Sequence, residues 1–359
     1  MGLANRLEEP RSYETLFVSP GFKVFPQLRF MGSKYRLLPW IEEVLSEYEF
    51  SSALDAFSGS GCVSYLLKCM GKRVISNDQL NFCAAITKAT VENERSVITA
   101  DIMRELLTYS LSHKHFIEKT FSGIFFTPDD LRFLDMVSYN IGRMADPYQR
   151  AIAGAALTRA CVKRQPRGVF TVAGDPEKYK DGRRDLRLTL KEHFIEQVEV
   201  YNNCVFAGGK ENRSVCGDIF SLTSTDVDLV YMDPPYVPRA DDNCYMKRYH
   251  FLEGLSCYWE GMEVMENSKV KKLPKLFTPF SYRKSALGSF EMMFEKFAKS
   301  ILVLSYSSNG YPDLDTLVGI MKKYKKEVQV FTKEHRYHFG THANAGRNVV
   351  EEYLIVGLR

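Results

Sequence analysis

The sequence lacks the features that mark secreted and membrane-spanning proteins. No uncharged apolar run reaches the roughly 18 residues that a membrane span needs. The N-terminus has no basic segment followed by an apolar one, as a secretory signal would. Internal repeats and low-complexity tracts are also missing. These absences predict a globular protein of the cytoplasm, neither secreted nor inserted in a membrane.

The cysteines show no metal or redox spacing. No two of the eight stand in the C-x-x-C arrangement that zinc knuckles and redox motifs use. A chain of 359 residues also buries enough apolar surface to fold without disulfides. We therefore expect eight reduced thiols: Cys62, Cys69, Cys83, Cys161, Cys204, Cys216, Cys244 and Cys257.

The chain has no large excess of charge of either sign. The 48 basic and 44 acidic residues give a net charge of +4, which by itself does not indicate a nucleic-acid partner. Within residues 159–191, however, ten basic residues stand against four acidic ones, so this segment carries +6 and the remainder −2. An arginine-rich, glycine-containing segment of this kind suits contacts with phosphates and guanine edges. A solvated basic loop is the alternative.

Short apolar runs alternate with glycine turns and helical stretches, which is typical of an α/β protein with a mainly parallel sheet. The last two runs are expected to pair as an antiparallel hairpin. The predicted strands cover residues 53–57, 73–76, 214–216, 228–232, 301–306, 327–331 and 353–358.

A segment of about a hundred residues interrupts this pattern. Residues 101–164 have mostly helical character, and one helix has a clear start at Thr127, with proline next and two acids in the first turn. We expect residues 1–95 and 206–359 to form the α/β domain and residues 96–205 to be inserted into it.

A glycine turn and an acid suggest a nucleoside cofactor. Phe57-Ser58-Gly59-Ser60-Gly61 stands where a strand meets a helix, so its backbone can approach a ligand closely. The third glycine of a dinucleotide fingerprint is replaced by Ser64, which argues against nicotinamide and flavin. Asp78, at the end of the next strand, can accept hydrogen bonds from ribose hydroxyls. A plain turn and a helix cap are the alternatives.

The most specific motif is Asp233-Pro234-Pro235-Tyr236, directly after the strand at 228–232. It lies at the carboxyl end of a parallel strand, where open α/β sheets bind ligands. The carboxylate and the Pro234 carbonyl can accept from an exocyclic amino group, while Tyr236 stacks on the attached ring. A proline-terminated strand with a surface tyrosine is the structural alternative.

These motifs, in this order and with an insertion between them, resemble the Dam-like (alpha-class) adenine-N6 DNA methyltransferases over most of the chain. The segment 29–34 resembles the family's first motif, in which an aromatic residue and a lysine contact the cofactor. The resemblance implies a Rossmann-like methyltransferase fold with a mostly parallel seven-stranded sheet and an inserted, mainly helical target-recognition domain. It also implies that S-adenosylmethionine, with no metal, binds at Phe30, Lys34, Phe57, Gly59, Gly61, Asp78, Asp218 and Asp233.

The resemblance further implies direct methyl transfer to the N6 amino group of an adenine flipped out of double-stranded DNA, with Asp233, Pro234 and Tyr236 as catalytic residues. A restriction-modification system with a separate cognate endonuclease is implied too, in the cytoplasm of a bacterium or phage-infected cell and bound to the nucleoid through DNA. No proline precedes a cysteine, so the Pro-Cys nucleophile of cytosine-C5 methyltransferases is absent.

Several predictions about DNA contacts and alternatives depend on single residues. Tyr245, Tyr249 and His250 could clamp the flipped nucleotide or belong to an ordered loop. His335, His338 and His342 stand at a strand end rather than on one helical face, so we expect no metal site.

The alternative functions cytosine-N4 transfer, RNA or protein amino-group methylation and an inactive DNA-binding relative stay open. The expected DNA contacts are Arg164, Arg167, Arg183, Arg184, Lys247 and Arg248.

Overall fold

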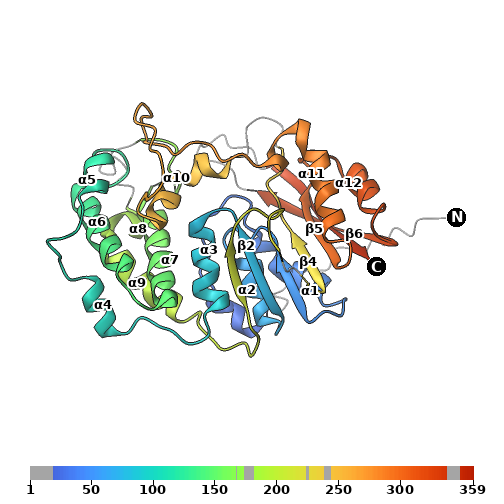
Figure 1. Cartoon of the computed structure of the whole chain (residues 1–359), viewed down its shortest axis with the longest axis horizontal. Coiled ribbons are helices and arrows are strands. Elements are labelled where there is room, and N and C mark those ends of the chain that lie inside the picture. Colours follow the sequence, from blue (N-terminus) through green and yellow to red (C-terminus); the bar gives the residue numbers. More distant parts are fainter. Residues whose placement is uncertain (1–18, 167, 174–181, 224–225, 238–243, 338–347) are drawn as a thin grey trace.

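A seven-stranded sheet organises the protein (Figure 1). The computed structural model describes residues 19–166, 168–173, 182–223, 226–237, 244–337 and 348–359. The strands run in the order β3-β2-β1-β4-β5-β7-β6, and β7 is antiparallel to both of its neighbours while the other pairs are parallel. Their bounds are β1 Ser52–Asp55, β2 Arg73–Asp78, β3 Arg213–Cys216, β4 Leu229–Met232, β5 Ile301–Ser307, β6 Glu327–Tyr337 and β7 Asn348–Leu358. The predicted α/β class, strand set and terminal antiparallel pair are confirmed.

The central strands are apolar on both faces because helices cover both sides of the sheet. Alternate residues such as Ala53 and Leu229 pack in one core with α1 (Leu38–Leu45) and α2 (Cys62–Cys69). Their neighbours Leu54 and Val230 pack in a second core with α11 and α12. A central strand covered on both faces therefore needs a continuous apolar run. Helix α11 spans Arg283–Lys296 and helix α12 spans Leu314–Met321.

The remaining helices gather at one end of the molecule (Figure 1). Thr127 caps α6 by accepting from the Asp130 N–H, as its sequence predicts, and Thr189 forms a capping box with Glu192 at the start of α9. The helices within residues 96–205, the segment predicted to be inserted, are α4 Ala100–Leu106, α5 Phe116–Thr120, α6 Pro128–Gly142, α7 Pro147–Arg164, α8 Arg184–Arg187 and α9 Leu190–Asn202.

Two segments from outside residues 96–205 pack in the same hydrophobic core as these helices. One is α3 (Asn81–Thr87), which continues into a π-helical turn η3 (Lys88–Glu92). The other is α10 (Tyr245–Ser256), which follows the Asp233 loop and packs among the inserted helices (Figure 1). Periodicity did not predict α10, because aromatic and aliphatic residues surround it on several sides. Short 3-10 turns complete the fold at η1 Pro20–Val24, η2 Lys34–Leu37 and η5 Pro279–Ser281.

Two expectations about composition can be compared with the fold. All eight cysteines are free thiols, and most are buried. No helix in the described part of the chain is both long and apolar enough to cross a bilayer.

Candidate active site

A cavity opens at the carboxyl ends of β1, β2 and β4, and parallel register explains which residues meet there. Asp55, the last residue of β1, is level with Ser76 on one side and Tyr231 on the other. Asp78 and Asp233 therefore both extend two residues beyond that level, on either side of β1. All three carboxylates line the cavity, at the point where an open sheet of this kind binds its ligands.

The glycine turn lines this cavity with residues 57–60, and close approach of other side chains shapes it. Gly59 has a φ of +50°, and a Cβ atom there would lie 2.9 Å from the ring of Phe30, so a larger residue would strain the backbone and displace that ring. Gly61 (φ +79°) ends the turn at the start of α2, and a Cβ atom there would meet Thr87 and Ile86. Phe30 and Gly59 border the cavity, whereas Gly61 shapes the turn from behind.

Asp78 is held in place by backbone donors. Its Oδ2 accepts from the Gly59 N–H at 2.8 Å and its Oδ1 from the Leu80 N–H at 2.9 Å. Burial nevertheless raises the pKa of Asp78 to about 6, since removal from water outweighs these hydrogen bonds. Each carboxylate oxygen keeps a further lone pair, so Asp78 can also accept from a pair of hydroxyl groups.

The two residues of the predicted first motif occupy different parts of the site. Phe30 lies against the glycine turn and stacks on Tyr249 with ring centroids 4.9 Å apart and an interplanar angle of 5°. Lys34 is 4% exposed, and its Nζ donates to Asp233 Oδ1 at 2.8 Å and to the Gly32 carbonyl at 3.2 Å. The lysine therefore serves the acid of the Asp-Pro-Pro-Tyr loop, a pairing that the sequence did not indicate.

Asp233 lies where two opposing effects act on its charge. Burial raises the pKa of its carboxyl group, and the Lys34 ammonium group works against that rise. The carboxylate remains 19% exposed, on the cavity side. A partly desolvated carboxylate beside one cation is a strong hydrogen-bond acceptor for a group that enters the cavity.

Sequence reasoning missed Asp55, a third acid of the site. Ser64 Oγ donates to its Oδ2 at 2.6 Å, and burial raises the pKa of Asp55 to about 7. The available signal was its position as the last residue of a buried strand, directly before the glycine turn.

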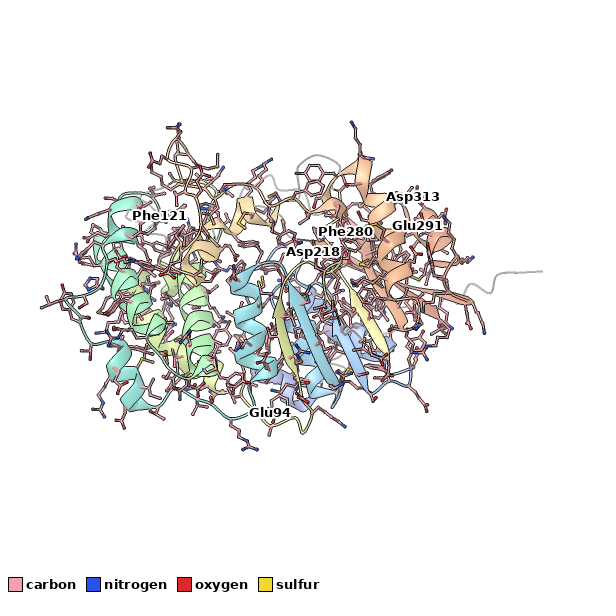
Figure 2. The ribbon with its side chains drawn as sticks, in the orientation of Figure 1. Glu94, Phe121, Asp218, Phe280, Glu291 and Asp313 are labelled. Carbon is pink, nitrogen blue, oxygen red and sulfur yellow. The ribbon has the colours of Figure 1, made fainter. Side chains whose placement is uncertain are left out.

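Part of the cavity lining is apolar and aromatic. Phe280 stacks on Phe220 at 5.7 Å and 10°, and it meets Phe57 edge-on at 5.4 Å. Asp218 stands beside this wall, where its Oδ2 accepts from Gln79 Nε2 at 2.9 Å. Figure 2 shows Asp218 and Phe280 together above the carboxyl ends of the strands. A flat heteroaromatic ring with polar edges suits such a wall.

The cavity fits S-adenosylmethionine in chemistry as well as in position. Ser58 Oγ and Asn77 Oδ1 are buried at its lining and have no hydrogen-bond partner within the described part of the chain. Buried polar atoms without partners point to a polar ligand. Carboxylates for hydroxyl and amino groups and an aromatic wall for a base match an adenosyl amino acid.

Pro234 and Tyr236, the other two predicted catalytic residues, are not among the residues that line the cavity, whereas Asp233 is. Pro235, rather than Pro234, lines the cavity. Tyr236 packs against Tyr306 with ring centroids 5.1 Å apart and an angle of 57°. Stacking of Tyr236 on a substrate ring and acceptance by the Pro234 carbonyl stay predictions.

The predicted DNA contacts fall into distinct environments. Arg164 is 12% exposed and pairs with Asp130 at 2.9 Å, which places its charge inside the helical part. Arg183 is exposed and donates to the Pro166 carbonyl, while exposed Arg184 pairs with Glu196. Lys247 and Arg248 lie half-buried on α10. Arg167 lies outside the described residues.

The histidines do not form a metal centre in the part of the chain that the structure describes. His335 lies in β6, whereas His338 and His342 fall outside the described residues. His250 is buried and hydrogen-bonded to the Phe170 carbonyl at 2.7 Å, and burial lowers its pKa to about 4. Tyr249 is buried as well, so both residues pack within the protein.

The strand order, the antiparallel seventh strand and a cavity with an Asp-Pro-Pro-Tyr loop at its edge together define a Rossmann-like methyltransferase that acts on amino groups. Comparison with known families narrows this class. Residues 30–285 match the D12 class N6 adenine-specific DNA methyltransferases, and the chain belongs to this family. It is therefore an adenine-N6-specific DNA methyltransferase, as its motifs predict, and enzymes of this kind use S-adenosylmethionine.

Curated relatives agree with this assignment. The chain is 28% identical to the Type II methyltransferase M2.HphI of Haemophilus parahaemolyticus over 87% of its own length and 92% of the relative's. It is 23% identical to M.CviAII of Paramecium bursaria Chlorella virus 1, with 91% and 97% covered. It also resembles M.FokI of Planomicrobium okeanokoites at 25% identity over 83% of this chain, but spans only 47% of that longer protein.

Proposed function

We propose that this enzyme methylates the N6 amino group of an adenine flipped out of double-stranded DNA, as the modification enzyme of a restriction-modification system. The observation that carries the proposal is the Lys34–Asp233 pair at 2.8 Å on the wall of a cavity that also holds Asp78. The restriction-modification role is supported by relatives named as Type II methyltransferases and modification methylases. A separate cognate endonuclease would then act on the same sequence, and the enzyme would be found at the DNA of its cell.

In this proposal Asp233 performs the main task of catalysis. The lone pair of the adenine amino group is delocalised into the ring, so the nitrogen is a weak nucleophile. Hydrogen bonds from the amino group to Asp233 and to the Pro234 carbonyl would favour a tetrahedral nitrogen whose lone pair is available. Lys34 favours the ionised form of Asp233, and an ionised carboxylate accepts more strongly than a protonated one.

The remaining residues would position the two reactants. Asp78 would hold the ribose hydroxyls, Asp218 and Phe57 the adenine of the cofactor, and the glycine turn would allow close approach. S-adenosylmethionine supplies an activated methyl group when bound. Placing the amino nitrogen in line with that group provides much of the acceleration, because orientation replaces a bimolecular encounter. The 19% exposure of Asp233 also fits base flipping, since a stacked base cannot reach it.

DNA recognition would fall to the helical part of the chain. We assign it to residues 96–205 within a catalytic domain of residues 1–95 and 206–359, and the shared core with α10 brings residues beyond the Asp233 loop to it. The exposed arginines 183 and 184 are the best placed of the candidates for phosphate contacts.

The direct test uses the purified full-length chain, S-adenosylmethionine with a labelled methyl group and unmethylated amplified DNA. Hydrolysis to nucleosides should place the label in N6-methyladenine. Label in N4-methylcytosine, or transfer to RNA but not DNA, would contradict the proposal. Methylation-aware sequencing of DNA from expressing cells should then show one modified sequence rather than random adenines.

Substitution of Asp78 by asparagine should weaken cofactor binding. Hydrogen bonds to a charged group contribute about 1.5–3 kcal/mol, so the Kd for S-adenosylmethionine should rise about 10- to 150-fold. Calorimetric titration measures this directly, and kcat at saturating cofactor should change much less. The exposed Asp315, substituted in the same way, serves as the matched control and should leave Kd unchanged.

Substitution of Arg183 by alanine should weaken DNA binding in a salt-dependent way. If Arg183 neutralises one phosphate, the slope of log affinity against log salt should become shallower by about 0.9. Filter binding or fluorescence anisotropy at several salt concentrations measures the slope. Arg164 provides the contrast, because its buried pair with Asp130 should make Arg164→Ala lower the melting temperature and leave the slope unchanged. An unchanged slope in Arg183→Ala would remove this residue from the interface.

A further inference from the structure

Helix α10 lies between the helical part of the chain and two segments that border the cofactor cavity. Tyr245, Tyr249 and Glu253 follow one another along it at intervals of four residues. Residues with this spacing project from the same face of a helix. All three side chains hydrogen-bond to the backbone of those bordering segments.

The two tyrosines hydrogen-bond to the segment that carries Phe30. The Met31 N–H donates to Tyr249 Oη at 2.7 Å, and Tyr245 Oη donates to the Met31 carbonyl at 3.2 Å. The Tyr249 ring also stacks on Phe30. Phe30 and Met31 both line the cavity, so the shape of its wall depends on where α10 lies.

Glu253 hydrogen-bonds to the second segment, at the start of α3. Its Oε1 accepts from the Asn81 N–H at 3.0 Å and from Asn81 Nδ2 at 2.7 Å, and its Oε2 accepts from the Phe82 N–H at 3.3 Å. These backbone donors belong to the first turn of a helix and have no partner within it. Glu253 is 2% exposed. Asp78, whose Oδ1 accepts from the Leu80 N–H, stands three residues before this turn.

Another face of α10 belongs to the insertion. Phe251 stacks on Phe170 at 5.0 Å and 16°, and it meets Phe121 edge-on at 5.0 Å. His250 Nε2 lies 2.7 Å from the Phe170 carbonyl. A displacement of the inserted helices on DNA would therefore move α10, and α10 cannot move without disturbing its bonds to the cofactor segments.

We propose that α10 couples DNA binding to cofactor binding, with Tyr245, Tyr249 and Glu253 as positioning residues that set the backbone at Met31 and at the start of α3. The inference rests on the proposed function, because it requires the helical part to engage DNA. Such coupling is reciprocal: if DNA tightens cofactor binding by a given factor, the cofactor tightens DNA binding by the same factor.

The experiment measures the Kd of the full-length enzyme for S-adenosylhomocysteine, which has no methyl group to transfer, with and without saturating unmethylated amplified DNA. In the wild type, DNA should lower this Kd by about 5- to 150-fold. Tyr249→Phe keeps the ring stack and removes the acceptor for Met31, and Glu253→Gln removes one carboxylate acceptor. Each should bring the ratio to within about twofold of one and raise the KM for S-adenosylmethionine more than it lowers kcat.

Tyr48→Phe is the matched control. The Tyr48 hydroxyl donates to Gln329 Oε1 at 2.6 Å, on β6 at the far edge of the sheet from α10, so its loss should leave the ratio unchanged. Melting temperatures identify any variant that does not fold. If either Tyr249→Phe or Glu253→Gln fails to fold, the ratio measured for the other one tests the coupling. A wild type that methylates DNA with a ratio of one, or folded variants that keep the wild-type ratio, would overturn the coupling alone. A wild type that binds S-adenosylhomocysteine but does not methylate DNA would overturn the proposed function.

Discussion

Asp233→Ala is expected to reduce methyl transfer at least about 10³-fold, which corresponds to roughly 4 kcal/mol of lost transition-state stabilisation. The side chain would no longer accept from the amino nitrogen as its geometry changes. The effect should fall on kcat, because the hydrogen bond to the amino nitrogen strengthens only as the transition state forms. Single-turnover assays with labelled S-adenosylmethionine measure the chemical step directly.

Two controls separate chemistry from folding in this variant. Asp315→Ala removes an exposed aspartate far along the chain and should keep wild-type activity. Asp233→Asn keeps the shape and an amide oxygen, so it should retain cofactor binding and lose most of the rate. Asp233→Ala with near-wild-type single-turnover rates would show that another group acts on the nucleophile.

The sequence predicted the sheet well because parallel strands covered on both faces leave continuous apolar runs. The run 228–232 leads directly into Asp233, and the run 53–57 leads into the glycine turn. The strands and the edge of the sheet that binds ligands could therefore be predicted together. Phe30, Asp78 and Asp218, which are predicted to bind the cofactor, line one cavity. Motifs at the carboxyl ends of neighbouring parallel strands converge on one edge of the sheet, although the strand order itself was not predicted.

Other parts of the site depend on contacts between distant segments. Lys34 and Asp233 stand 199 residues apart, and no local pattern indicates that their charges pair. α10 could not be predicted because its apolar residues meet the insertion on one face and the cofactor segments on another. The basic composition of segment 159–191 led to the prediction that Arg164 contacts DNA, but the Arg164 charge pairs with Asp130 in the interior. Composition reports charge, whereas only packing determines which charges face solvent.

Lys34→Met should cause the second large loss, and its pH dependence identifies the cause. Burial raises the pKa of Asp233 and Lys34 opposes that rise, with their charged atoms 2.8 Å apart. Removal of the ammonium group therefore raises the pKa of Asp233 further. Activity requires the ionised carboxylate, so it is present above that pKa and lost as the pH falls through it. The acidic limb of the rate profile should accordingly move to higher pH.

The profile of single-turnover rate between about pH 6 and pH 9 measures this shift. At neutral pH the variant should be markedly slower, and raising the pH should restore part of the rate, because a larger fraction of the Asp233 carboxyl group is then ionised. Lys34→Arg keeps the charge and should keep the acidic limb near its wild-type position. Lys68→Met removes another buried lysine, which donates to the Thr90 and Asn93 carbonyls, and should change stability alone. If the acidic limbs of Lys34→Met and wild type coincide, Lys34 acts on the cofactor and not through the charge of Asp233.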